Sequence, residues 1–170
     1  MERLRYPSAP TVTAVEKEPQ LKELHLVRAV IFNDQAQALL IKRGPNQSFD
    51  TFLWELPGGK LNEGEDALEA LKREVHEETG LEVRVPEQVK MEDNRTMEGG
   101  KYDGVNAKTE TWVCLTDEYE VNLDVEEVPE HAGAQWCTKA EVEEMYEKGE
   151  LSITTKQAIE NFLLIPTSNS

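Results

Sequence analysis

Three glutamates crowd into a five-residue stretch of this acidic chain, at Glu74, Glu77 and Glu78. If the stretch is helical, the spacing i, i+3 and i+4 places all three carboxylates on one face. Neighbouring carboxylates on an exposed helix repel one another by about 0.2–0.5 kcal/mol per pair. A bound Mg²⁺ or Mn²⁺ ion would reverse that repulsion, because these ions prefer carboxylate and water oxygens. Taken alone, the cluster is either a solvated acidic surface or a metal site.

The residues around the cluster decide between these two interpretations. Five residues separate Gly59 from Glu65, and seven separate Glu65 from Arg73. The segment REVHEETGL follows, so that nine positions fit one pattern: Gly59, Glu65, Arg73, Glu74, Val75, Glu77, Glu78, Gly80 and Leu81. This pattern is the Nudix box, and the chain therefore resembles the Nudix (MutT-related) hydrolase family.

The resemblance implies an α/β fold, the α/β/α sandwich around a mixed β-sheet, in which the box forms a loop, a helix and a second loop. It also implies metal-dependent hydrolysis of a nucleoside diphosphate linked to another group, with Mg²⁺ or Mn²⁺. By position, Glu74, Glu77 and Glu78 become metal ligands, and the carbonyl of Gly58 becomes a further one. Arg73 would orient the glutamates through hydrogen bonds.

Two roles stay open within this resemblance. Glu65 either assists a second metal ion or caps the helix. The proton of the attacking water is accepted by Glu77, or alternatively by Glu130. Relatives of the MutT type hold an extra acid six residues before a tryptophan, and the segment EHAGAQW places Glu130 six residues before Trp136.

Four residues outside the box are candidates for substrate contact. Arg43 ends the apolar segment ALLIKR, where the family often places an arginine that binds phosphate. Arg28 is unusual inside the strand-like segment HLVRAVIF and is also expected to face the phosphates. Tyr102 lies in a polar, glycine-rich segment from Asn94 to Lys108, predicted to be a loop in which this ring stacks on a base. His131, next to Glu130, is a further candidate.

The glutamates depend on a helix between Asp66 and Gly80. Asp66 and Glu69 have the spacing of a capping box, and Gly80 is a natural left-handed stop. An apolar stripe recurs at steps of three and four residues, comprising Ala67, Leu68, Leu71 and Val75. The helix is therefore predicted to bury one face and to present the glutamates on another.

The remaining elements predict one mixed α/β domain over residues 21–170, preceded by an arm at residues 1–20 that contains three prolines. Strands are expected at 25–32, 38–43, 109–116 and 134–138, and extended chain at 81–90. Two helices are expected near 139–149 and 155–165. At 170 residues the chain is long enough to bury a core.

Composition limits the partners. The chain has 18 basic and 34 acidic residues, a formal charge of -16, which disfavours nucleic acid polymers, whose binding needs Lys and Arg. A small phosphorylated substrate is compatible if a divalent cation accompanies it. Cys114 and Cys137 lie in apolar segments and are expected to be buried free thiols. No run is long enough for a membrane span and no secretory core opens the chain, which favours a cytoplasmic protein; homodimer formation is possible.

These observations favour an enzyme of the MutT type, which cleaves a nucleoside triphosphate to monophosphate and pyrophosphate. The loop lengths before the box and the spacing from Glu130 to Trp136 resemble that branch. An ADP-ribose or ADP-sugar pyrophosphatase is the alternative substrate assignment. A non-catalytic module that senses nucleotides is the alternative of another class, and the intact box argues against it.

Overall fold

The computed structural model describes residues 23–46, 52–86, 90–125 and 130–163. The predicted arm at residues 1–20 lies outside these ranges. Within these ranges the chain forms seven strands and three α-helices, with one turn of 3-10 helix at Gly100–Tyr102. The strands are β1 (Glu23–Phe32), β2 (Ala38–Arg43), β3 (Trp54–Glu55), β4 (Gly58–Lys60), β5 (Lys90–Thr96), β6 (Asn106–Leu115) and β7 (His131–Cys137). The helices are α1 (Ala67–Thr79), α2 (Lys139–Glu147) and α3 (Ile153–Leu163).

The strands form one mixed sheet in the order β3-β2-β1-β6-β5, with β4 paired to β1 and β7 paired to β2. Strands β1 and β6 are parallel along their whole length, and the other pairs are antiparallel. The register joins β1 to β2 at Phe32 and Ala38, whereas β4 pairs with the earlier part of β1, from Leu26 to Arg28. Strand β4, which opens the box, therefore lies directly against β1.

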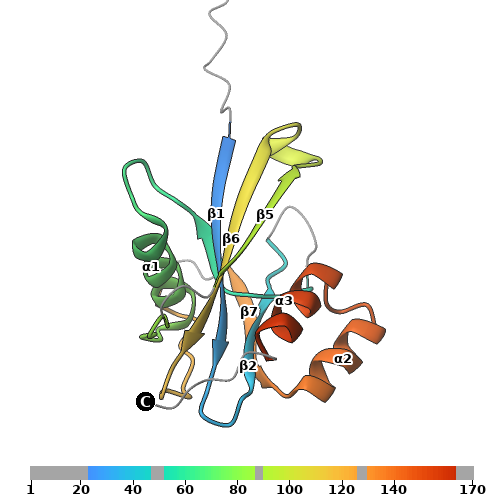
Figure 1. Ribbon diagram of the computed structural model, residues 1–170. Helices are drawn as coiled ribbons and strands as arrows, with labels where there is room; N and C mark the ends of the chain where they lie inside the picture. The colour runs from blue at the N-terminus through green and yellow to red at the C-terminus, as the bar shows by residue number, and fades with distance from the viewer. Residues whose placement is uncertain (1–22, 47–51, 87–89, 126–129, 164–170) are drawn as a thin grey trace, which may run out of the picture.

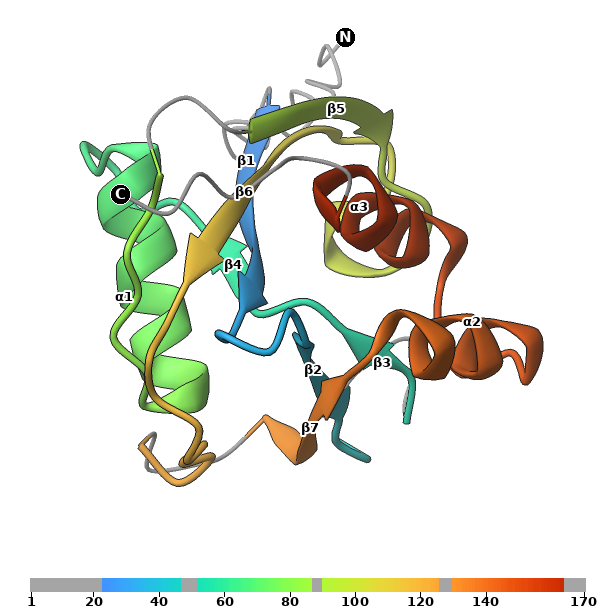
Figure 2. The same cartoon turned by 60° about the horizontal axis from the view of Figure 1, so that its bottom comes forward.

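Alternate residues of β1 point into two separate cores. Val27, Ala29 and Ile31 pack with residues of α1, whereas Val30 and Phe32 pack with residues of α2 and α3. Figures 1 and 2 show α1 on one face of the sheet and α2 with α3 on the other. The predicted α/β/α sandwich around a mixed sheet is confirmed.

The predicted loop from Asn94 to Lys108 is partly wrong: residues 97–105 form a connecting turn, but residues 94–96 and 106–108 lie in strands β5 and β6. Strands β5 and β6 are antiparallel, with Lys90 opposite Trp112 at one end and Thr96 opposite Asn106 at the other, so the two strands form a β-hairpin. Strand β5 is the last in the sheet and almost all of its side chains are exposed. An exposed edge strand needs no apolar alternation, which is why its polar sequence resembles a loop.

Three further features concern the two cysteines, His25 and the length of the helices. Cys114 and Cys137 are free and buried, as predicted, and burial raises the pKa of each thiol to about 12. His25 has a structural contact, since its Nε2 lies 3.0 Å from a carboxylate oxygen of the buried Glu110. No helix in the described part of the chain combines the length and apolar character that a membrane crossing requires.

Candidate functional site

Helix α1 is fixed at both ends by the residues that the sequence predicts. The side chain of Asp66 accepts hydrogen bonds from the backbone N–H groups of Leu68 and Glu69, at 2.9 and 3.0 Å. Gly80 ends the helix with φ of 72°, a left-handed conformation that glycine adopts without strain. Ala70, Leu71 and Val75 are buried. Leu68 is 39% exposed, so its predicted place in the apolar stripe is wrong; in the first turn it lies beyond the core.

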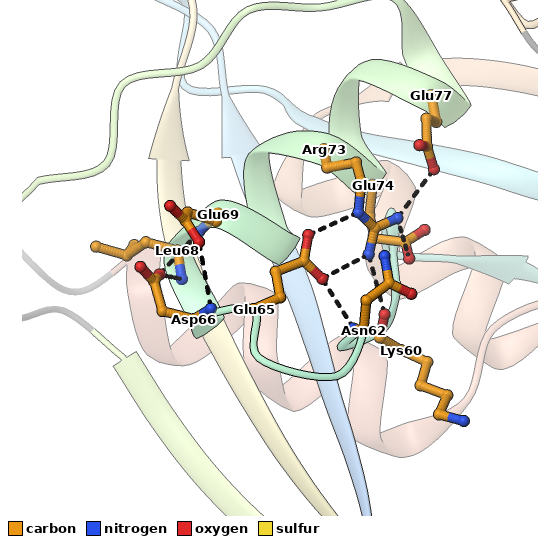
Figure 3. A network of polar contacts seen from close by, with 9 residues as sticks. All are labelled: Lys60, Asn62, Glu65, Asp66, Leu68, Glu69, Arg73, Glu74 and Glu77. Carbon is orange, nitrogen blue, oxygen red and sulfur yellow. Dashed lines mark hydrogen bonds and ion pairs between the residues drawn. The ribbon is translucent and has the colours of Figure 1, made fainter.

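Arg73 is the centre of a hydrogen-bond network on a half-buried face of α1 (Figure 3). Its Nε and Nη2 donate to the two carboxylate oxygens of Glu65, at 2.8 and 3.0 Å. Its Nη1 donates to Glu74 and Glu77, at 2.9 and 3.0 Å, and Nη2 also reaches the carbonyl of Lys60. One guanidinium therefore contacts three carboxylates and the loop before the helix.

Glu65 does not cap the helix, because Asp66 occupies that position. Besides the two bonds from Arg73, Glu65 accepts a bond from the backbone N–H of Asn62 at 2.9 Å. The hydrogen bonds from Arg73 lower the pKa of Glu65 to about 2. In this arrangement Glu65 braces the box loop through its bonds to Arg73 and Asn62.

The two glycines of β4 permit close contacts. A Cβ atom on Gly59 would collide with the carboxylate of Glu74, and one on Gly58 would collide with the carbonyl of Val27 in β1. Gly58 also has φ of 154°, outside the range that side chains favour. Glycine is thus required for the carboxylate of Glu74 to lie against the β4 backbone.

Glu78 lies deeper than the other two glutamates of the cluster. Its side chain is only 9% exposed, and its Oε2 accepts a hydrogen bond of 2.8 Å from the backbone N–H of Gly58. Burial raises the pKa of Glu78 well above its ordinary value, and the negative charges of Glu74, Glu55 and Glu130 raise it further. A buried carboxylate among other carboxylates is costly unless a cation compensates the charge.

The structure adds Glu55, which the sequence analysis missed. Arg43 Nη1 lies 2.8 Å from Glu55 Oε2, and His131 Nε2 lies 3.1 Å from Glu55 Oε1. The same His131 nitrogen is 3.9 Å from Glu78 Oε1, and this histidine is only 6% exposed. Burial by itself would raise the pKa of Glu55, but the hydrogen bonds from His131 and Arg43 lower it overall. An acid beside Trp54 in the apolar segment FLWELPGG was the available signal.

The other predicted residues are placed as follows. Glu130 is exposed, its carbonyl accepts a bond from Gly44 N at 3.0 Å, and its charge acts on Glu78. Tyr102 lies in the hairpin between β5 and β6, where its ring centroid is 5.9 Å from Nζ of Lys60 in β4. Arg28 pairs in register with Gly58. The fold therefore brings segments from β2, β3, β4, β7 and α1 together around Glu78.

The donor set fits a hard divalent cation. Carboxylates and backbone carbonyls are the ligands that Mg²⁺ and Mn²⁺ prefer, and the buried charge of Glu78 needs a positive partner. Within residues 23–46, 52–86, 90–125 and 130–163, no three His, Cys, Asp or Glu side chains already meet the spacing of a metal site. Glu74 and Glu77 are instead held by Arg73 and Glu78 by Gly58 N, so binding an ion would redirect these carboxylates.

Known proteins are similar to parts of this sequence and have a similar fold. The chain is 40% identical to an 8-oxo-dGTP diphosphatase of Proteus vulgaris over 62 residues, which cover 36% of this chain and 54% of that protein. It is 28% identical to an RNA pyrophosphohydrolase of Haemophilus influenzae over 130 residues, covering 66% of this chain and 60% of that one. The matches thus span less than two thirds of these curated relatives.

The fold is shared with a solved structure, that of a MutT protein from Methanosarcina mazei Go1. The TM-score is 0.63 at 24% identity, and the match covers 85% of this chain and 96% of the other. Residues 25–159, which make up most of the chain, match the family described as the NUDIX domain. The chain therefore belongs to the NUDIX domain family.

Proposed function

We propose that the protein is a metal-dependent pyrophosphohydrolase that cleaves a nucleoside triphosphate to the monophosphate and pyrophosphate. The observation that carries this proposal is the buried carboxylate of Glu78, which lies among Glu55, Glu74 and Glu130 and has a raised pKa. Such a concentration of negative charge is suited to a cation that in turn binds a diphosphate. The named activity of the Proteus vulgaris relative supports a triphosphate substrate.

The ion is proposed to be Mg²⁺ or Mn²⁺, held by Glu74, Glu77, Glu78 and the carbonyl of Gly58. When bound, it would neutralise the diphosphate and make water easier to deprotonate. Glu77 is proposed to accept the proton of the attacking water, with Glu130 as the alternative. Arg73 holds the glutamates in place through the bonds described above.

The proposed phosphate contact of Arg43 has to be compatible with its bond to Glu55. That bond, 2.8 Å from Nη1 to Oε2, fixes the guanidinium at the end of β2, beside the strand that carries His131. A guanidinium held in this way loses little conformational freedom when it binds an anion. Glu55 is therefore proposed to position Arg43 for the phosphates.

The two alternatives differ from this proposal in the products that they would release. An ADP-ribose or ADP-sugar pyrophosphatase would release AMP and a sugar phosphate. A nucleotide-sensing module would bind a nucleotide and release no product. The network of Arg73 with Glu65, Glu74 and Glu77 favours catalysis, because a sensor has no need to preserve this arrangement of carboxylates.

The test is to incubate the purified chain with Mg²⁺ and a nucleotide panel, and to resolve the products by chromatography. The panel comprises canonical dNTPs, 8-oxo-dGTP, ADP-ribose, ADP-glucose and a diadenosine polyphosphate, each repeated with EDTA. We expect a triphosphate to give monophosphate and pyrophosphate only without EDTA. If ADP-ribose alone is cleaved, with release of AMP, the substrate assignment changes to ADP-ribose. Binding of a nucleotide without any product would favour the sensing module.

Arg73→Lys is expected to weaken the apparent affinity for Mg²⁺ by about 10- to 100-fold, because lysine cannot bridge Glu65, Glu74 and Glu77 at once. The measurement is the Mg²⁺ concentration that gives half-maximal hydrolysis. Arg84→Lys is the matched control, since Arg84 is exposed and pairs only with Asp117 among the described residues. An unchanged Mg²⁺ dependence in a folded Arg73→Lys protein would remove Arg73 from the positioning role.

A further inference from the structure

Arg28 is an arginine inside a mostly buried strand. It lies between Val27 and Ala29, both fully buried, and its register partners are Gly58 in β4 and Thr111 in β6. Among the described residues its side chain forms no hydrogen bond or ion pair, and its Nε is shielded from solvent with no acceptor. Burial lowers the pKa of Arg28, yet a guanidinium stays charged in proteins. An unpaired buried donor of this kind costs stability unless a ligand supplies the acceptor.

The side chain of Arg28 lies on the face of the sheet opposite to α1. Side chains alternate along a strand, and Val27 and Ala29 face α1. Arg28 therefore shares its face with Val30, which packs with α2 and α3. The glutamates of the box belong to α1, which covers the other face of the sheet. The backbone of Arg28 is nevertheless beside Gly58, whose N–H contacts Glu78.

The surroundings of Arg28 do not favour a second phosphate. Arg95 in β5 is the nearby positive charge, while Asp93 in β5 and Glu55 in β3 are the nearby negative charges. Counting Arg28 itself, these four side chains carry two positive and two negative charges, and Glu55 is in addition paired with Arg43. The hydroxyl-bearing residues Thr109 and Thr111 are buried on the same face. This balance suits a neutral group that offers a hydrogen-bond acceptor, whereas an anion would meet the two carboxylates.

We infer that the Nε–H of Arg28 donates to a carbonyl oxygen on the pairing edge of the substrate's base. This inference rests on the proposed function, which places the diphosphate at the box glutamates. The position meant is C6 of a purine or C4 of a pyrimidine, the part of the pairing edge that carries either a carbonyl or an amino group. Hypoxanthine, guanine, uracil and thymine present a carbonyl there, whereas adenine and cytosine present an amino group. Arg28 thus selects keto bases over amino bases.

The test measures binding by calorimetry and needs no turnover. In the presence of Mg²⁺, the Kd values of dIMP and dAMP are compared, and likewise those of dUMP and dCMP. Each pair exchanges a carbonyl for an amino group at one position of the ring. We expect the wild-type chain to bind the keto member about tenfold or more tightly in at least one pair, because a buried donor left unpaired is costly.

Three variants complete the design. Arg28→Met removes the donor, Arg28→Lys keeps the charge without the Nε–H, and Arg84→Met is a folded control at an exposed arginine. Both Arg28 variants are expected to bring the two Kd values of the selective pair within about twofold, while Arg84→Met keeps the difference. Arg28→Lys guards against a folding failure of the uncharged variant, and circular dichroism monitors the fold of each.

The outcomes separate the inference from the proposed function. Equal wild-type affinities in both pairs would overturn it, as would a preference that survives in folded Arg28 variants. Equal weakening of both members of a pair would assign Arg28 to the phosphate or sugar and would also overturn it. Hydrolysis of dITP is assayed in parallel. A keto preference that depends on Arg28, without any hydrolysis, would keep the inference and reject the enzyme.

Discussion

Replacing Glu78 by glutamine is expected to lower hydrolysis by about 1,000-fold and, at the same time, to stabilise the metal-free protein. The two effects have one cause, the buried negative charge. Glutamine keeps an oxygen that accepts the bond from Gly58 N–H, but it removes a carboxylate that burial and the charges of Glu74, Glu55 and Glu130 make unfavourable. Relief of that repulsion and desolvation is expected to add about 1 kcal/mol to the free energy of unfolding.

Adding Mg²⁺ should reverse the order of stabilities. An ion that binds only the folded state stabilises it by about 2.7 kcal/mol at a concentration 100 times its Kd. The wild-type chain is therefore expected to gain stability from Mg²⁺, whereas Glu78→Gln gains little. The measurement is urea unfolding with Mg²⁺ and with EDTA, alongside the rate of triphosphate hydrolysis.

A matched control is Glu63→Gln, which neutralises an exposed carboxylate in the loop before α1. It should change neither the hydrolysis rate nor the response to Mg²⁺. Equal stabilisation of wild type and Glu78→Gln by Mg²⁺ would show that Glu78 is not a ligand. Full activity in Glu78→Gln would contradict the proposed metal site altogether.

The box could be predicted in detail because its information is local. The capping box at Asp66, the left-handed stop at Gly80 and the carboxylates that meet Arg73 all depend on residues within one helix and its adjoining loop. Helix geometry then fixes which side chains meet. The sandwich followed from the same resemblance.

Contacts between distant segments could not be predicted. Glu55 contacts Arg43 and His131 only because β3 and β7 both pair with β2. The periodicity of residues within one strand does not reveal which strands pair. The polar sequence of β5 concealed an edge strand, because its position at the edge frees it from the need for an apolar face. Arg28 is unusual within its strand already in the sequence. The face of the sheet that its side chain occupies could be assigned only from the two cores, one packed with α1 and the other with α2 and α3.

Glu77→Gln is expected to lower the maximal rate of hydrolysis by about 100- to 10,000-fold, the range for loss of a general base. The variant should fold, because Glu77 is 38% exposed on α1 and its amide can still accept the bond from Arg73 Nη1. The assay measures the rate as a function of Mg²⁺ concentration. If Glu77 acted only as a ligand, enough Mg²⁺ would restore the rate; loss of the base leaves the rate low at saturation.

Glu130→Gln decides between the two candidate bases. Glu130 is exposed, and its described hydrogen bond is made by its backbone carbonyl, so its side chain is not held as Glu77 is by Arg73. A base must be fixed within hydrogen-bond reach of the water, which favours Glu77. At saturating Mg²⁺, Glu130→Gln is expected to lose less than about tenfold in rate. A larger loss of rate in Glu130→Gln than in Glu77→Gln would assign the role of general base to Glu130 and leave Glu77 as a metal ligand alone.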